Sequence, residues 1–229
     1  MQPQVQVQFG GEAVRSTRSY PPGYRIKPVD QQQAILRELF PGLATTSIVG
    51  AGALPGGAEG WFVIPRWPAI ASTYNAAAMK VLAAIARTRE ASIARVDRLG
   101  GDRLRQHERT IGMFGKPRGD VEAHMLAVPA QFGLRHRGRS VRHAREMFEE
   151  NEFGLGVFAA GCMLLTHPER LSQAEQLYLD CAGDEYSSSD EQQFSEAPFF
   201  RFIDGSIGFG TSWIGYVDSY FGSATAFTS

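Results

Sequence analysis

The sequence predicts an α+β fold with a mixed or antiparallel sheet. Segments with helical periodicity and segments with strand-like alternation are interspersed, without the regular βαβ spacing of a doubly wound sheet. Near the C-terminus, FFRFI, Asp204-Gly205 and SIGFG follow one another, which is a strong hairpin signal. No internal repeat and no interdomain linker is visible, so we expect one domain spanning residues 1–229.

The first forty residues predict an extended segment followed by a helix. Residues 4–9, QVQVQF, alternate between polar and apolar side chains, which is typical of a strand. Residues 1–28 as a whole suit an extended arm or loop, because Gly and Pro recur in them. Asp30 is a good N-cap residue for a helix, and Pro41-Gly42 ends that helix.

The middle of the chain alternates between strand and helix signals. In order, it predicts strands at residues 47–50 and 61–67, an Ala-rich helix at 73–99, a short helix at 102–109 and a strand at 121–132. Pro65 indicates a sheet edge or a bulge in the second strand. A basic loop follows, and Ser140 then caps a helix that runs to about residue 151.

The C-terminal third predicts more helix around the hairpin. Residues 153–165 are apolar or small on all sides, which is typical of a buried helix. Pro168 suits the first turn of a further helix, and Gly183 follows its end. After the hairpin, residues 211–221 predict a last short helix, with core filling as the main role of the aromatic residues around it.

Composition bounds the class of protein. The chain has 229 residues, a formal net charge of −1 and two cysteines, which are too few for a disulfide framework. The first residues lack the pattern of a secretory signal, and the longest apolar run, residues 153–166, is shorter than the roughly 20 residues of a membrane span. We expect a cytoplasmic protein that does not contact membranes. Its 20 Arg against 3 Lys indicate GC-rich coding and a prokaryotic origin.

Two glycine-rich stretches resemble nucleotide-binding patterns without matching them. The loop with Gly50, Gly52 and Gly56 is followed by a strand, whereas a dinucleotide site needs a helix there. Between Gly112 and Gly115-Lys116 the spacing is too short for a phosphate-binding P-loop, and a simple turn is the better interpretation. No motif predicts a cofactor or a bound metal.

The charge is strongly polarised along the chain. Residues 87–145 carry fourteen Lys or Arg and six Asp or Glu, whereas residues 146–229 carry two basic and fourteen acidic residues. This division indicates either a charged partner or complementary contacts between the two regions.

The densest basic segment, residues 135–145, predicts a binding function. Its five arginines suit phosphate oxygens, and two arginines of the preceding helix add to the positive field. These candidate anion-binding residues are Arg135, Arg137, Arg139, Arg142, Arg145, Arg95 and Arg98. The leading hypothesis is therefore a non-enzymatic protein that binds nucleic-acid phosphate or another polyanion.

Two other hypotheses stay open. A structural protein would form homo-oligomers through contacts between the basic middle and the acidic, aromatic tail. An enzyme would be centred on Glu122 and His124, which share one face of the expected strand, with Arg135 orienting an anionic substrate. Asp180, Asp184 and Glu185 are interpreted as an acidic helix end, although acidic residues oppose the helix dipole there.

Overall fold

The computed structural model describes residues 11–44, 52–89, 101–114, 123–189 and 192–228. In these ranges the chain forms α-helices and two mostly antiparallel sheets, which confirms the α+β class. The predicted strands at residues 4–9 and 47–50 lie outside the described residues.

A four-stranded antiparallel sheet has the order β1-β3-β10-β4. Its strands are β1 (Gly60–Pro65), β3 (Met125–Gln131), β10 (Thr225–Phe227) and β4 (Glu152–Gly154). Because β1 lies at the edge, Pro65 removes no internal ladder bond, as predicted from the sequence. The C-terminal strand β10 lies between β3 and β4, in the interior of the sheet.

The second sheet has the order β2-β6-β7-β5-β9, with β8 paired to β7. Its strands are β2 (Leu104–Gln106), β6 (Asp184–Tyr186), β7 (Glu196–Ile203), β5 (Tyr178–Asp180), β9 (Phe221–Ser223) and β8 (Ser206–Trp213). The β7–β8 hairpin confirms the Asp204-Gly205 prediction, and both of these turn residues have positive φ.

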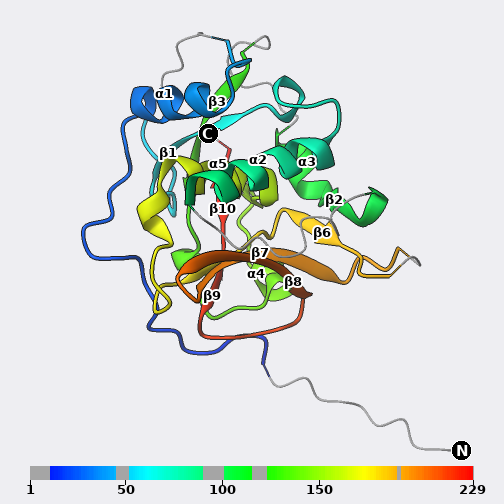
Figure 1. The fold of residues 1–229 in the computed structure, drawn as a ribbon. Helices are drawn as coiled ribbons and strands as arrows, with labels where there is room; N and C mark the ends of the chain where they lie inside the picture. Colours follow the sequence, from blue (N-terminus) through cyan, green and yellow to red (C-terminus); the bar gives the residue numbers. More distant parts are fainter. Residues whose placement is uncertain (1–10, 45–51, 90–100, 115–122, 190–191, 229) are drawn as a thin grey trace, which may run out of the picture.

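The helices cover and separate the sheets. They are α1 (Val29–Leu39), α2 (Tyr74–Arg89), α3 (Glu108–Phe114), α4 (Val141–Glu146) and α5 (Val157–Thr166), with short 3₁₀ turns η1 (Trp67–Ala69), η3 (Gly101–Arg103), η4 (Leu134–His136) and η5 (Pro168–Arg170). Every residue of α5 is buried, as the apolar run predicts. Figure 1 shows α2 and α5 across the centre of the molecule, with α1 above them and the β7–β8 hairpin below. A side chain at Gly161 would overlap Val81, so this glycine permits the close approach of α5 to α2.

Several local predictions are wrong. Residues 102–109 contain most of η3, β2 and the start of α3 rather than one helix, and Gly112 lies inside α3 rather than in a turn. Residues 168–182 contain only η5 and β5, and residues 211–221 contain the end of β8 and a loop instead of a helix. At β2 and β5, short strands pair with partners far along the chain, and this pairing overrides the local helix signal.

The N-terminal strap, which we define as residues 11–28, runs extended from the start of α1 down one side of the molecule (Figure 1). It is held by distant residues: Val14 donates to the Gly138 carbonyl at 2.7 Å, and Ser19 accepts from the Leu177 amide at 3.0 Å. Tyr20 lies against the fully buried Arg170 guanidinium, whose carbon is 4.0 Å from the ring centre. The strap is thus packed onto the C-terminal half of the chain.

Candidate functional site: an apolar pocket at the start of helix α5

A pocket of about 260 Å³ opens where β1 ends and where α2 and α5 begin. Its walls are mainly apolar, and they include Ile64, Trp67, Pro68, Ile111, Phe114 and Phe158. Three polar side chains also line it: Arg66, Tyr74 and Gln106. An apolar cavity with a few polar groups is the usual form of a small-molecule site.

Tyr74 and Asp184 together hold the floor of the pocket. The Tyr74 hydroxyl donates to the carboxyl group of Asp184, with both oxygens at 2.8 Å, and the Val157 amide donates to the same group at 2.7 Å. Asp184 is fully buried and satisfies the first amide of α5, which would otherwise lack a partner. The floor is therefore a capped helix start, and not an open anion site.

Two glycines allow this close packing. A Cβ atom at Gly156 would overlap both the Asp184 carboxyl and the Tyr74 hydroxyl. A Cβ atom at Gly183 would overlap the backbone of residues 154–156. Any larger residue would push the Asp184 segment away from α5, so the geometry of the floor depends on these positions.

Burial shifts the protonation of the groups behind the floor. It raises the pKa of Asp184 to about 7, against the hydrogen bonds from Val157 and Tyr74, which favour the charged form. Burial alone raises the pKa of Asp180 to about 7, and it keeps the pKa of the Cys181 thiol well above its ordinary value. The pKa of Tyr74 is also raised by burial, so this hydroxyl stays a neutral donor. The prediction of a solvated acidic helix end is wrong, because Asp180 and Asp184 are buried strand residues.

Arg66 lines the pocket without a counter-ion. Its backbone amide donates to the His124 carbonyl at 2.8 Å and its Nε donates to the Ala123 carbonyl at 3.1 Å. In the part of the chain that the structure describes, its two terminal nitrogens have no acceptor and no carboxylate pairs with it. The pocket lining therefore includes an arginine whose guanidinium is held at Nε and whose terminal nitrogens have no acceptor among the described residues.

The arginines of the 135–145 segment are occupied by partners within the chain. Arg135 donates from Nε to Glu152 at 3.2 Å and also pairs with Glu149. Arg142 donates from Nε to Glu12 of the strap at 2.9 Å. Arg145 donates to the carbonyls of Ala182 at 2.9 Å and Asp184 at 2.8 Å, and Glu185 lies 3.7 Å from it.

The other predicted arginines make weaker contacts or lie elsewhere. Arg137 is exposed and donates to the Arg18 carbonyl at 3.2 Å, and Arg139 lies 3.0 Å from Nδ1 of His136. Arg95 and Arg98 lie outside the described residues. The structure thus brings residues 135–145 together, but it does so around carboxylates of the same chain.

Glu152 is the central acceptor of that segment. Its fully buried carboxylate lies 2.7 Å from His136 Nε2 and accepts from the Thr225 hydroxyl at 2.7 Å, in addition to Arg135. Although burial raises the pKa of Glu152, the hydrogen bonds from His136 and Thr225 bring it below the ordinary value. A charged, fully hydrogen-bonded carboxylate of this kind has a structural role.

The pair predicted as an enzyme centre is not described as a pair, because Glu122 lies outside the described residues. His124 uses Nδ1 to accept from the Ala44 amide at 3.0 Å, so its ring holds a neighbouring loop. Among the described side chains, no group of three His, Cys, Asp or Glu residues could hold a metal ion.

Sequence reasoning missed Arg66, Tyr74 and Gln106 as site residues. They come from three separate parts of the chain, and only the tertiary structure brings them to one pocket. Two signals were present: Arg66 stands between Pro65 and Trp67-Pro68 in an otherwise apolar run, and Asp184 fitted a helix end badly.

No protein-family model, curated protein or solved structure matches this chain. Within the described ranges, every helix is too short or too polar to span a bilayer.

Proposed function

We propose that the protein binds a small apolar molecule in the pocket at the start of α5. The observation that supports this function is a mainly apolar cavity of about 260 Å³, in which three of the described lining side chains are polar. This volume lies near the lower end of the usual range for ligand pockets, which favours a small ligand over a peptide.

The packing around the pocket supports binding to a preformed site. Asp184 fixes the start of α5, and the Lys80 ammonium donates to the Ile70 carbonyl at 2.7 Å, which ties α2 to the turn that follows β1. A site whose walls are already fixed loses little conformational entropy on binding.

Calorimetric titration with the neutral probe 2-naphthamide tests the proposal. Ala159 lines the pocket, and Ala159→Leu adds three carbons to its wall. Ala83→Leu is the matched control, because Ala83 is exposed on α2. We expect saturable binding to the wild type and to Ala83→Leu, and binding at least about tenfold weaker to Ala159→Leu. No saturable binding to the wild type, or equal binding to both variants, would contradict the proposal.

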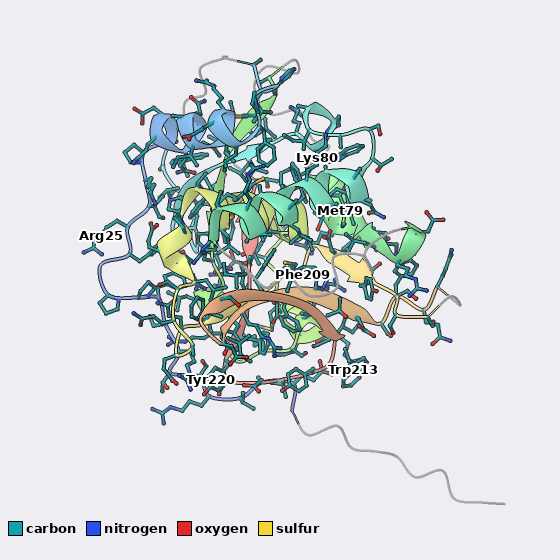
Figure 2. All side chains as sticks on the ribbon, in the orientation of Figure 1. Arg25, Met79, Lys80, Phe209, Trp213 and Tyr220 are labelled. Atoms are coloured by element: carbon teal, nitrogen blue, oxygen red, sulfur yellow. The ribbon has the colours of Figure 1, made fainter. Side chains whose placement is uncertain are left out.

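Binding of nucleic-acid phosphate or another polyanion is the second candidate. The exposed Arg137 and the side chain of Trp213, which is 41% exposed beside Arg142, support it (Figure 2). The internal pairs of Arg135, Arg142 and Arg145 weaken it, because each pair would have to break before a phosphate could replace it. Retention on heparin that falls steeply between about 50 and 200 mM salt would support this candidate.

Self-association and a cytoplasmic, prokaryotic setting remain predictions. Arg145 and Arg105 both contact Glu185 inside one chain, so this part of the basic middle already meets the acidic tail without a second copy. Light scattering at low and high salt would reveal an oligomer held by charge. The two buried free cysteines suit a reducing compartment.

A further inference from the structure

The pocket lining carries a positive charge, although most of its walls are apolar. Of the described residues that line it, Arg66 is the charged one, and none is Asp or Glu. The nearest acidic group behind the floor, Asp184, is covered by Tyr74 and Gly156 and accepts from both Tyr74 and Val157. Among the described residues, a ligand therefore meets a positive charge and no carboxylate on the lining.

The local structure fixes this charge in place. Pro65 and Pro68 restrict the backbone on both sides of Arg66, and hydrogen bonds to the carbonyls of residues 123 and 124 hold its backbone and its Nε. The two terminal nitrogens remain as donors for another molecule. A guanidinium presents its donors in a planar fork, which matches the two oxygens of a carboxylate.

Gln106 adds a second polar group. Its backbone pairs with Asp184 in the β2–β6 ladder, which fixes its position, and its side-chain amide makes no hydrogen bond to any described residue. The amide can donate to an anionic oxygen or accept from a protonated one.

We infer that the ligand of this pocket is a small apolar acid, with its carboxylate on Arg66 and Gln106 and its hydrocarbon part against Trp67, Phe114 and Phe158. This inference rests on the proposed function and specifies the substrate class of the same site. Next to apolar walls, a charge-assisted hydrogen bond is stronger than in water, so the acid gains affinity over a neutral molecule of the same shape.

The test compares 2-naphthoate with 2-naphthamide by calorimetry on the wild type, Arg66→Gln and Arg25→Gln. Arg25 is the matched control, because it is exposed and points away from the body of the molecule (Figure 2). We expect the wild type and Arg25→Gln to bind the acid at least about tenfold more tightly than the amide. In Arg66→Gln this preference should disappear, while the affinity for the amide stays within about twofold of the wild type.

The outcomes separate the two proposals. If the wild type binds neither probe, the proposed function fails. If it binds both equally, or if Arg66→Gln keeps the preference, binding in the pocket stands and the acid is wrong. Tighter binding of 2-naphthyl phosphate than of 2-naphthoate to the wild type would assign the anion as a phosphate and overturn the carboxylate.

Discussion

The segment of residues 135–145 and the pocket wall at Arg66 use the same side chain in opposite ways. Three of the five arginines in the segment face a carboxylate of the chain within 4.0 Å. Arg66 is a single arginine in an apolar stretch, and no described carboxylate pairs with it. The number of arginines in a segment therefore says little about how many can bind a partner.

The difference arises from where the counter-ions lie in the sequence. Glu149 and Glu152 follow the basic segment closely, and Glu12 reaches Arg142 from 130 positions away because the strap crosses α4. Arg135, Arg142 and Arg145 thus each face a carboxylate that lies outside residues 87–145. Two kinds of mutation test this contrast. One removes a carboxylate partner of the 135–145 segment, and the other replaces Arg66 itself.

The largest expected effect is in the basic segment. Glu152→Ala removes the buried acceptor of Arg135, His136 and Thr225, and we expect it to lower the free energy of unfolding by about 3–5 kcal/mol. Glu150→Ala is the control, since Glu150 is exposed. Urea denaturation at pH 7 measures both, and Arg66→Gln should change the same quantity by less than about 0.5 kcal/mol. A loss below about 1 kcal/mol in Glu152→Ala would remove the contrast between the two regions.

The floor of the pocket should respond nearly as strongly to a single methyl group. In Gly156→Ala the new Cβ overlaps Asp184 and Tyr74, and we expect a loss of about 2–3 kcal/mol together with weaker probe binding. Gly208→Ala is the control, because its Cβ would lie 3.4 Å from the flexible Arg201 side chain. Thermal unfolding compares Gly156→Ala with Gly208→Ala. Equal melting temperatures would show that Asp184 and Tyr74 can move to accommodate the added methyl group.

The comparison between paired and unpaired charged groups extends to the acids behind the pocket. Asp180 is a buried acid that makes no salt bridge to any described cation. Its folded pKa, about 7, lies above the unfolded value near 4, so the folded state holds the proton more tightly. Stability should therefore fall as the pH rises from about 4 to about 7.

Asp180→Asn should remove part of that slope. We expect the variant to gain on the order of 2–3 kcal/mol relative to the wild type between pH 5 and pH 8. Asp184 keeps its own contribution in both proteins, since its pKa is raised as well. Urea denaturation at the two pH values provides the numbers, and parallel profiles would show that Asp180 titrates normally.

The smallest effect is expected at the surface of the basic segment. Arg142 and Glu12 are both partly exposed, so Arg142→Gln should cost less than about 1 kcal/mol. Salt should weaken this pair further, because exposed charges are screened. Chemical denaturation at low and high salt checks both statements, and a loss above about 2 kcal/mol would show that the strap depends on this pair.

Local signals predicted part of the fold. The Asp204-Gly205 hairpin follows from turn chemistry, and the Ser140 cap is confirmed because its hydroxyl accepts from the His143 amide. The strands β5 and β9 are three residues long and depend on partners more than twenty residues away, so no local pattern predicts them.

The candidate site was less predictable than the fold. Arg66, Gln106 and Phe158 are far apart in sequence and meet only after α5 has packed between the sheets. Asp184 could not be recognised as a helix cap, because the helix it caps begins 27 positions earlier. Charge density, the strongest signal in the sequence, highlighted the region in which the charges neutralise one another.

The position of β10 has a consequence for synthesis on the ribosome. This strand, Thr225–Phe227, is the only described link between β3 and β4 in the four-stranded sheet, yet it is made roughly seventy residues after β4. Neither neighbour can complete its ladder until residue 227 has left the exit tunnel. Until then the backbone edges of β3 and β4 that β10 will occupy are unpaired, which makes this interval the stage most exposed to aggregation.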